Sequence, residues 1–595
     1  MYVLGLSCFF HDAAAALLKD GVLVAAAEEE RFTRKKHDYG FPVNAIQFVL
    51  ESEGIRGEDL DYVAFFEKPF QKFERILMTS LQMFPWALPV FREAMITWML
   101  DKLWVSALIT EKIGVPREKI LFSEHHLSHA ASAYLCSPFD EAALLTVDGV
   151  GEWATASYGV GRGNDVKLDR QIEFPHSLGL LYSAFTAFLG FEVNEGEYKV
   201  MGMAPYGEPR YVDKVYKLID QGGDGSFRLN MEYFAFHRST KESYTHRFVD
   251  LFGEPRASDL LFFTKESGFP SYFGEQPTNY EELCRTNQHY ADVAASVQRV
   301  TEEILLDMAN HLHRQTGLKK LCMAGGVALN SVANGRILRE TPFEDVFIQP
   351  SAGDGGGALG AALWAYNTLL GHPRRFVLEH AFWGKSYPDS EVESFLKSEG
   401  IRYERLEEDR LLDRTVDALQ AGEVIGWYQD EFEWGPRALG HRSILADPRR
   451  EEMKDVVNTK IKFREPYRPF APAVLSGHID EYFDTAGVPD LESQYPGRFM
   501  LLVFDVKPSK RSVIPAVTHV DGTGRLQTVV REANSRYHDL IARFGEATGV
   551  PVVLNTSFNL RGEPIVSTPQ QAYSTFSRSG MDRLVLGNYV VTKKE

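Results

Sequence analysis

The chain has 595 residues, more than a single hydrophobic core usually organises, so we expect two or three domains. Hydrophobic residues make up 44% and charged residues 25%, as in an ordinary globular protein. Lys and Arg number 64 against 82 Asp and Glu, and the net charge of -18 disfavours binding to nucleic acid or to an anionic membrane.

Cysteine use and the N-terminus indicate the compartment. Cys8, Cys136, Cys284 and Cys322 lack C-x-x-C spacing, which argues against a zinc ribbon or a disulfide framework and suits a reducing compartment. No signal-peptide pattern precedes the first strand, so we expect a cytoplasmic protein. The most apolar stretch, residues 76–105, is interrupted by prolines and charges and is a poor membrane span. It suits packing in the core, against the mate in a homodimer or over a substrate cleft.

The first half of the chain predicts an element order that occurs twice. Strands are expected at residues 2–6, 13–18, 22–27, 60–67 and 119–123, with a helix at 42–53. Strands then follow at 142–148, 152–160, 166–174, 319–324 and 345–349, with helices at 177–189, 290–316 and 355–370. This order predicts an internal duplication. Two such α/β lobes resemble the actin, Hsp70 and sugar-kinase fold, whose cleft holds a nucleotide.

A change of composition at residues 371–375 predicts a linker. We therefore expect one domain at residues 1–370 and a second α/β domain at 371–595, with strands at 424–428, 500–506 and 552–555.

A histidine pair suggests a metal site. The segment 124–134 predicts a helix with Ser123 as its N-cap, and His125 and His129 project from one face of it because they are four residues apart. An isolated pair of this kind is more often structural. Asp148 ends an apolar strand and Asp354 precedes a helix, although either can also act as a cap. Two imidazoles and two carboxylates suit Fe²⁺, Mn²⁺ or Zn²⁺ better than Mg²⁺.

Glycine-rich turns in the same half suggest a nucleotide site. They place backbone amides where a phosphate can approach, at Gly325, Gly326 and Asn330 and again at Gly353 and Gly355. Tight packing of helix on strand is the alternative reading.

Two further polar features have an ordinary salt-bridge or turn role as their alternative. Lys199, in a glycine-punctuated loop, is a candidate contact for a phosphate. His11 and Asp12, after the first strand, offer an acid–base pair.

The second domain contains the basic cluster that the acidic chain otherwise lacks. Arginines in such a cluster suit bidentate contacts to phosphate, whereas a solvated basic face is the alternative. The candidates are Arg437, His441, Arg442, Lys460, Arg464 and Arg468, with Lys462 in the same run, followed near the end of the chain by Asn555, Ser557, Asn559 and Arg561.

Six motifs in this order resemble the O-carbamoyltransferases of nodulation and antibiotic tailoring, which include the tobramycin, cephamycin, novobiocin and ansamycin enzymes. They are FHDAA at 10–14, EEERFTRKKH at 28–37, HHLSHA at 125–130, GGVALN at 325–330, GPRALG at 435–440 and NTSFN at 555–559. The resemblance extends over essentially the whole chain. It implies a Kae1-like first domain and a YrdC-like second domain.

The resemblance also implies a reaction. Carbamoyl phosphate and ATP, the latter with Mg²⁺, form carbamoyl adenylate on the second domain, and the first domain transfers the carbamoyl group to a hydroxyl of a small-molecule acceptor such as a secondary metabolite or glycoside. It implies iron at the four His and Asp ligands, nucleotide contacts at the glycine turns, carbamoyl phosphate contacts in the basic cluster, and acceptor activation by His11 or Asp12. The apolar stretch favours a large, partly hydrophobic acceptor.

Two other functions fit the same elements. A small-molecule kinase of the sugar-kinase type needs only the two-lobe fold, and it would produce ADP without carbamoyl phosphate. A nucleotide-binding regulatory protein needs no turnover, but it leaves the basic cluster and the metal ligands unexplained.

Overall fold

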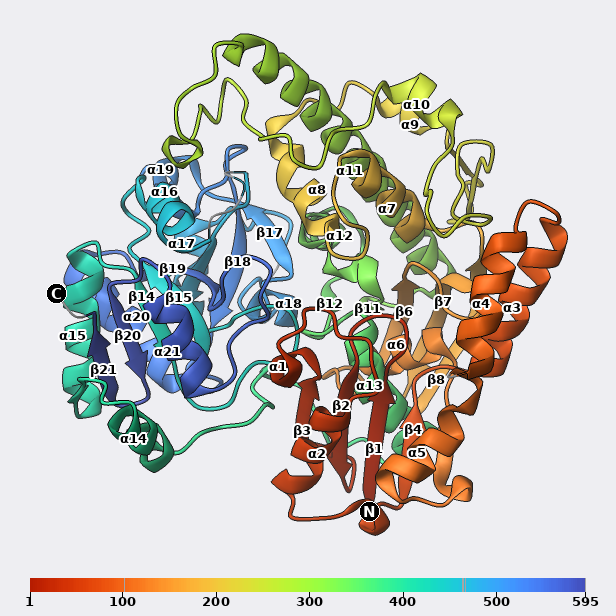
Figure 1. Ribbon diagram of the computed structural model, residues 1–595, viewed down its shortest axis with the longest axis horizontal. Coiled ribbons are helices and arrows are strands. Elements are labelled where there is room, and N and C mark those ends of the chain that lie inside the picture. Colours follow the sequence, from red (N-terminus) through yellow and green to blue (C-terminus); the bar gives the residue numbers. More distant parts are fainter. Residues whose placement is uncertain (101, 463–464, 466, 489, 594–595) are drawn as a thin grey trace. The chain divides into compact units, whose positions relative to one another are not determined.

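The computed structural model describes residues 1–100, 102–462, 465, 467–488 and 490–593 (Figure 1). The chain forms two compact units, and neither is continuous in sequence. The first comprises Met1–Glu29, His37–Leu260 and Gln288–Leu378, and the second comprises Glu30–Lys36, Leu261–Asn287 and Glu379–Glu595.

The first unit contains two five-stranded sheets with the same topology. One has the order β3-β2-β1-β4-β5, formed by β3 (Val22–Glu28), β2 (Ala14–Lys19), β1 (Tyr2–Ser7), β4 (Tyr62–Phe65) and β5 (Ile120–Phe122). The other has the order β8-β7-β6-β11-β12, formed by β8 (Asp165–Glu173), β7 (Ala154–Arg162), β6 (Glu141–Val147), β11 (Lys320–Ala324) and β12 (Asp345–Phe347).

Strand directions also agree between the two sheets. In each sheet, the first three strands in this order form an antiparallel meander. The remaining two strands run parallel to the strand at the middle of the sheet, which is β1 in one sheet and β6 in the other. The internal duplication predicted from the sequence is therefore confirmed, and the unit has the actin/Hsp70/sugar-kinase-like architecture.

Two helices, α6 (His125–Tyr134) and α13 (Asp354–Leu363), pack on each other and on these sheets. Their close approach depends on glycine, because a Cβ at Gly5 of β1 would lie 1.8 Å from the carbonyl oxygen of Ala358. A Cβ at Gly360 would lie 1.8 Å from the carbonyl oxygen of Ser128. The small side chains of α13 thus bring the beginnings of two helices into one buried region.

The other helices of the first unit surround this core. They are α2 (Val43–Ser52), α3 (Pro69–Gln82), α4 (Leu88–Leu100), α5 (Val105–Ile113), α7 (Leu178–Phe188), α8 (Glu197–Met203), α9 (Val212–Val215), α10 (His246–Phe252), most of α11 (Tyr280–Thr316), and α12 (Ser331–Glu340). A small ribbon of β9 (Ile219–Gln221) and β10 (Phe227–Leu229) is separate from the main sheets. Helices α3 and α4 form a hairpin that extends away from the sheets of the first unit (Figure 1).

The second unit is built on one nine-stranded mixed sheet. Its strands, in spatial order, are β13 (Glu404–Arg405), β21 (Tyr589–Thr592), β20 (Arg583–Leu586), β14 (Ile425–Tyr428), β15 (Arg442–Ala446), β19 (Val552–Ser557), β16 (Ala471–Leu475), β18 (Thr523–Val529) and β17 (Leu502–Asp505). The strands predicted near 424, 500 and 552 are all present.

Alternating side chains of this sheet form two packed faces. Trp427 of β14 belongs to a buried cluster with Leu411 of α15 (Glu408–Gln420) and with Tyr537 and Phe544 of α20 (Ser535–Thr548). The neighbouring residue Gly426 faces the Phe558 ring. Helix α21 (Pro569–Ser577) contacts β14 and β20 and α14 (Asp389–Ser398), so the sheet is covered by helices.

An N-terminal segment belongs to this second unit. It includes α1 (Glu30–Thr33), and the Arg34 guanidinium donates hydrogen bonds of 2.7 Å to the carbonyl oxygens of Pro564 and Ile565. The Ser567 hydroxyl donates to the carbonyl oxygen of Arg31 at 2.8 Å.

Candidate metal centre and active site

Helix α6 carries the histidine pair, but Ser123 does not cap it. The N-cap residue is Glu124, and the Ser123 hydroxyl donates instead to the carbonyl oxygen of Glu124 at 3.2 Å. The predicted cap is therefore wrong. A buried carboxylate takes that role from a distant part of the chain, because the His125 amide donates to both oxygens of Glu152 at 3.0 and 3.1 Å.

The four predicted metal ligands come together. The Nε2 atoms of His125 and His129 lie 3.1 Å apart. Oδ2 of Asp148 lies 3.2 Å and Oδ1 of Asp354 lies 3.5 Å from Nε2 of His125. All four donor atoms lie within 4.8 Å of one another, and all four residues are buried.

This donor set fits a divalent cation. Two nitrogens bound at about 2.0–2.1 Å to one ion lie roughly 3.0–3.4 Å apart, so the observed imidazole spacing is what shared coordination requires. Among the residues that the structure describes, Oδ2 of Asp354 and Nδ1 of His129 have no hydrogen-bond partner although they are buried. A cation would offset the cost of burying two carboxylates together.

Elements of both lobes hold these ligands. Asp148 directly follows β6, and its Oδ1 accepts a 2.8 Å hydrogen bond from the Gly326 amide, which fixes the other oxygen toward the histidines. Asp354 is the first residue of α13, where a carboxylate is favoured by the helix dipole.

Protons and metal compete for the same nitrogens. Burial lowers the pKa of His125, but Asp354, Asp148 and Glu67 outweigh it and raise the pKa to about 10. The pKa of Asp148 is held well below its usual range, against the effect of burial, by the two histidines. His126 points elsewhere, to the Thr146 hydroxyl at 2.7 Å, and burial followed by its histidine neighbours lowers its pKa to about 3. Metal binding therefore has to displace protons from His125 and His129.

A third buried carboxylate, that of Glu67, lies next to the predicted ligand His125. Oε2 of Glu67 is 3.8 Å from Nδ1 of His125 and accepts a 2.5 Å hydrogen bond from the Lys72 ammonium, and all three side chains are buried. Burial raises the pKa of Glu67, but Lys72 and His125 outweigh it and lower the pKa to about 2. Glu67 was not among the predicted site residues, although its position just after β4, a strand parallel to β1, was a usable signal.

Asp12 joins two imidazoles into one group. Its two oxygens lie 2.7 Å from Nδ1 of His11 and 2.7 Å from Nδ1 of His37. Burial lowers the pKa of His11, but Asp12 outweighs it and raises the pKa to about 10. A Cβ at Gly355, next to the predicted ligand Asp354, would lie 3.8 Å from Cβ of Asp12, so this His–Asp–His group lies beside the predicted metal ligands. His37 was not among the predicted site residues.

The loop before α8 contacts the group formed by His11, Asp12 and His37. Nε2 of His11 lies 2.9 Å from the carbonyl oxygen of Asn194. Lys199, on α8 itself, is half-buried, with its ammonium 5.5 Å from the centre of the Phe191 ring.

The glycine turns differ in how much room they leave. A Cβ at Gly325 would clash with the carbonyl oxygen of Val147, and the Gly326 amide is used by Asp148. A Cβ at Gly353 would meet nothing within 4 Å. Asn330 caps α12 through the Ala333 amide and also bonds to Gln298.

The second unit contains a lysine-centred polar site. The Lys462 ammonium is buried and donates to Asn559 Oδ1 at 2.8 Å, to the Ser557 hydroxyl at 3.3 Å, and to the backbone carbonyl oxygens of Ser557 and Asn559. Arg468 and Arg561 each form an ion pair of 3.7 Å with Glu465. The predicted Lys460 faces away, toward Asp582 at 3.6 Å, and the predicted Arg464 lies outside the described residues.

Several other predicted residues support the backbone of this unit. Oε1 of Glu433 accepts hydrogen bonds from the amides of Leu439, His441 and Arg442 at 2.8–3.0 Å. The buried Arg442 guanidinium donates to backbone carbonyl oxygens and stacks on Tyr428.

His441 and Asn555 are likewise engaged. The His441 ring stacks on Phe382 at 3.5 Å, and burial holds its pKa well below the usual range. The Asn555 amide donates to Gln527 at 2.7 Å and to the Ala438 carbonyl oxygen. Arg437 lies half-buried in the same loop.

With this geometry in place, the whole chain can be compared with known proteins. A family model described as carbamoyltransferase N-terminus matches residues 2–363, and one described as carbamoyltransferase C-terminus matches residues 416–593. The chain belongs to the carbamoyltransferase family. It is therefore an enzyme that transfers carbamoyl groups.

Relatives of this carbamoyltransferase match over long segments. An uncharacterised protein of Synechocystis is 45% identical over 100% of this chain and 97% of its own. The nodulation protein NolNO of Sinorhizobium fredii is 38% identical over 98% of this chain and 79% of its own. The 3'-hydroxymethylcephem-O-carbamoyltransferase of Streptomyces clavuligerus is 33% identical over 42% of this chain and 44% of its own.

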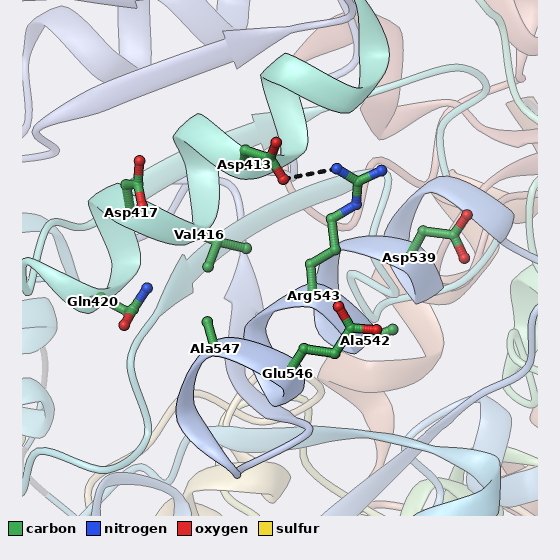
Figure 2. A pocket seen from close by; sticks show the side chains of 9 residues that line it. All are labelled: Asp413, Val416, Asp417, Gln420, Asp539, Ala542, Arg543, Glu546 and Ala547. Carbon is green, nitrogen blue, oxygen red and sulfur yellow. Dashed lines mark hydrogen bonds and ion pairs between the residues drawn. The ribbon is translucent and has the colours of Figure 1, made fainter.

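A surface groove of the carbamoyltransferase lies apart from these sites. Figure 2 shows it between α15 and α20, where Arg543 forms a 2.7 Å ion pair with Asp413. The residues lining it are Asp413, Val416, Asp417, Gln420, Asp539, Ala542, Arg543, Glu546 and Ala547, none of which is a predicted site residue. Across the described part of the chain, no helix is long and apolar enough to cross a membrane.

Proposed function

We propose that this enzyme is an ATP-dependent O-carbamoyltransferase with two reaction sites. The observation that carries the proposal is the buried His125, His129, Asp148 and Asp354 donor set in a chain that matches both carbamoyltransferase models. The relative that acts on a hydroxymethylcephem supports a hydroxyl as the acceptor.

We assign adenylate formation to the second domain, residues 371–595. Carbamoyl phosphate releases phosphate with the uptake of water, the carbamate oxygen attacks the α-phosphorus of ATP, and pyrophosphate leaves. The Lys462 ammonium, held by Ser557 and Asn559, supplies positive charge for phosphate oxygens, and Arg468 and Arg561 add charge nearby. This buried lysine is the residue that we propose in place of Lys460 as the central phosphate contact.

We assign carbamoyl transfer to the first domain, residues 1–370. The acceptor hydroxyl attacks the carbamoyl carbon, the bond to AMP breaks, and the hydroxyl proton passes to the enzyme. A divalent cation held by the four ligands, for which we propose Fe²⁺ with Mn²⁺ or Zn²⁺ as alternatives, supplies Lewis-acid polarisation when bound.

His11 is our candidate for the proton acceptor. Asp12 binds Nδ1 of its imidazole and raises its pKa to about 10, so His11 must first lose a proton before it can accept one from the acceptor hydroxyl. We infer that Lys199 and the turn at Gly353, where a Cβ would meet nothing within 4 Å, contact the nucleotide phosphate, with Gly325, Gly326 and Gly355 shaping the turns around it.

The test is a reaction of the purified full-length enzyme with carbamoyl phosphate, ATP, Mg²⁺ and Fe²⁺ against a panel of hydroxylated metabolites and glycosides. We expect AMP and pyrophosphate only when carbamoyl phosphate is present, and an acceptor heavier by one carbamoyl group. ADP as the nucleotide product without carbamoyl phosphate would instead indicate a small-molecule kinase.

A further inference from the structure

The hairpin of α3 and α4 ends in an apex with an unusual surface. Residues 76–91 contain no charged side chain. Four large apolar side chains there are exposed, namely Leu81 (59%), Phe84 (67%), Trp86 (74%) and Leu88 (54%). They come from the end of α3, the connecting turn and the start of α4, so they surround one projecting tip (Figure 1).

The hairpin does not need these side chains for its own packing. Its stem has a separate interior, in which the Phe73 and Trp98 rings lie 6.2 Å apart and Trp98 is buried. At the base of α3, Lys72 is fixed by Glu67. The apex is thus an exposed apolar surface carried on an internally packed stem.

The size of the apex argues against a second copy of the chain as its occupant. Large side chains each present about 150–250 Å² when fully exposed, so four that are exposed by 54–74% offer roughly 500 Å². This exposed area is similar to that of the largest apolar patch on a typical monomer, but it is smaller than the ~800 Å² per partner that a stable protein interface buries.

The chemistry of the apex favours a lipid surface. Exposed Trp and Phe side chains are those that partition into the boundary between head groups and acyl chains. The absence of charge over residues 76–91 removes the desolvation cost of inserting this tip, whereas the net charge of -18 opposes approach to anionic lipid.

We propose that the apex of the α3–α4 hairpin docks this enzyme on a zwitterionic phospholipid bilayer by inserting Phe84 and Trp86 into the interfacial layer. The docking is peripheral and involves no membrane-spanning helix. It does not depend on carbamoyl transfer, and it places the first unit, with its metal ligands, at a surface where acceptors with a lipid portion reside.

The test is flotation of the full-length protein with phosphatidylcholine vesicles. Wild type should float with the vesicles, and F84S/W86S should reduce the bound fraction at least about tenfold. Raising the salt concentration should leave wild-type binding unchanged, because apolar insertion is not screened. The matched control is F70S/W104S, which changes the same two residue types at exposed positions of the insertion outside residues 76–91.

Three results would overturn the proposal: no wild-type binding, equal loss of binding in both double variants, or binding abolished by salt. Light scattering gives a fourth criterion, since a wild-type dimer that F84S/W86S converts to a monomer would make a second copy the occupant. Circular dichroism of both variants, compared with wild type, establishes that the stem remains folded. No readout involves catalysis, so failure here is separable from failure of the proposed reaction.

Discussion

Lys72 donates a 2.5 Å hydrogen bond to Glu67, and the two buried side chains lie directly behind His125. At 3.8 Å the Glu67 carboxylate does not hydrogen-bond to Nδ1 of His125, but its negative charge raises the basicity of the imidazole. The lysine keeps that carboxylate ionised in a buried site, as the lowered pKa of Glu67 reflects. The first turn of α3 is thereby connected to the proposed metal centre.

Replacing Glu67 with Gln should weaken metal binding about 10–100-fold, because it removes the negative charge that raises the basicity of the His125 imidazole. Competition of the protein with a chelator for Fe²⁺ or Co²⁺ measures the effect. Glu74→Gln, at an exposed position of the following helix α3, is the control and should bind metal as wild type does. Equal affinities of the two variants would remove Glu67 from the metal centre.

His129→Ala should lower bound metal and abolish carbamoyl transfer, since it removes one of four ligands. Carbamoyl-phosphate-dependent release of pyrophosphate should persist, because we assign that step to the second domain. His126→Gln is the matched control, as His126 lies on the same helix but bonds to Thr146. A transfer rate unaffected by His129→Ala would refute the metal role.

Lys462→Met should reduce carbamoyl-phosphate-dependent pyrophosphate release by about 100-fold or more, the size expected when a buried charged donor to phosphate is lost. Lys460→Met removes a lysine two residues away that faces Asp582, and it should leave the rate within about twofold of wild type. Thermal unfolding of both variants separates lost chemistry from lost fold. The opposite ranking of the two variants would restore Lys460 as the phosphate contact.

Asp12→Asn should change the pH dependence of transfer. With its pKa near 10, His11 keeps its proton at neutral pH, so transfer in wild type should accelerate as pH rises. Without the Asp12 charge, burial dominates and the pKa of His11 falls, so the rising limb should move to lower pH while the maximal rate declines. Transfer rates measured from pH 6 to 10 at saturating metal test this, and an unmoved limb would exclude His11 as the base.

The same pair affects stability in a defined direction. The folded-state pKa of His11 lies above its ordinary value of 6.5, so binding of this proton adds to the free energy of unfolding. This stabilisation is complete below about pH 6.5 and is lost as the pH rises toward 10. Chemical denaturation of wild type and Asp12→Asn at pH 6 and 9 should therefore show a larger difference at pH 6.

The grouping of the four predicted ligands was predictable because the position of each depends on a local rule. Helical spacing puts His125 and His129 on one face, and Asp148 and Asp354 stand where a strand ends and a helix begins. The duplicated sheets followed from the repeated element order. Ser123 was the exception, since the distant Glu152 satisfies the helix end in its place.

The second unit was harder to read because its basic residues differ in tertiary surroundings, not in type. Residues Asn458–Lys462 form a π-helical turn, which changes the direction of side chains relative to an α-helix and points Lys462 to Ser557. Arg442 is as basic as any phosphate ligand but is used by backbone carbonyl oxygens. No periodicity in the sequence distinguishes a basic side chain that faces the polar site from one that binds backbone carbonyl oxygens.

The contacts of Arg34 have a consequence for biosynthesis. Its partners Pro564 and Ile565 are separated from it by 530 and 531 residues along the chain. At about 5–20 residues per second, the ribosome needs roughly half a minute to two minutes to make that intervening chain. The segment Glu30–Lys36 must therefore wait, unpaired with its final neighbours, until Pro564 and Ile565 have been made. The second unit thus cannot be completed before that point, although part of it is translated near the start of the chain.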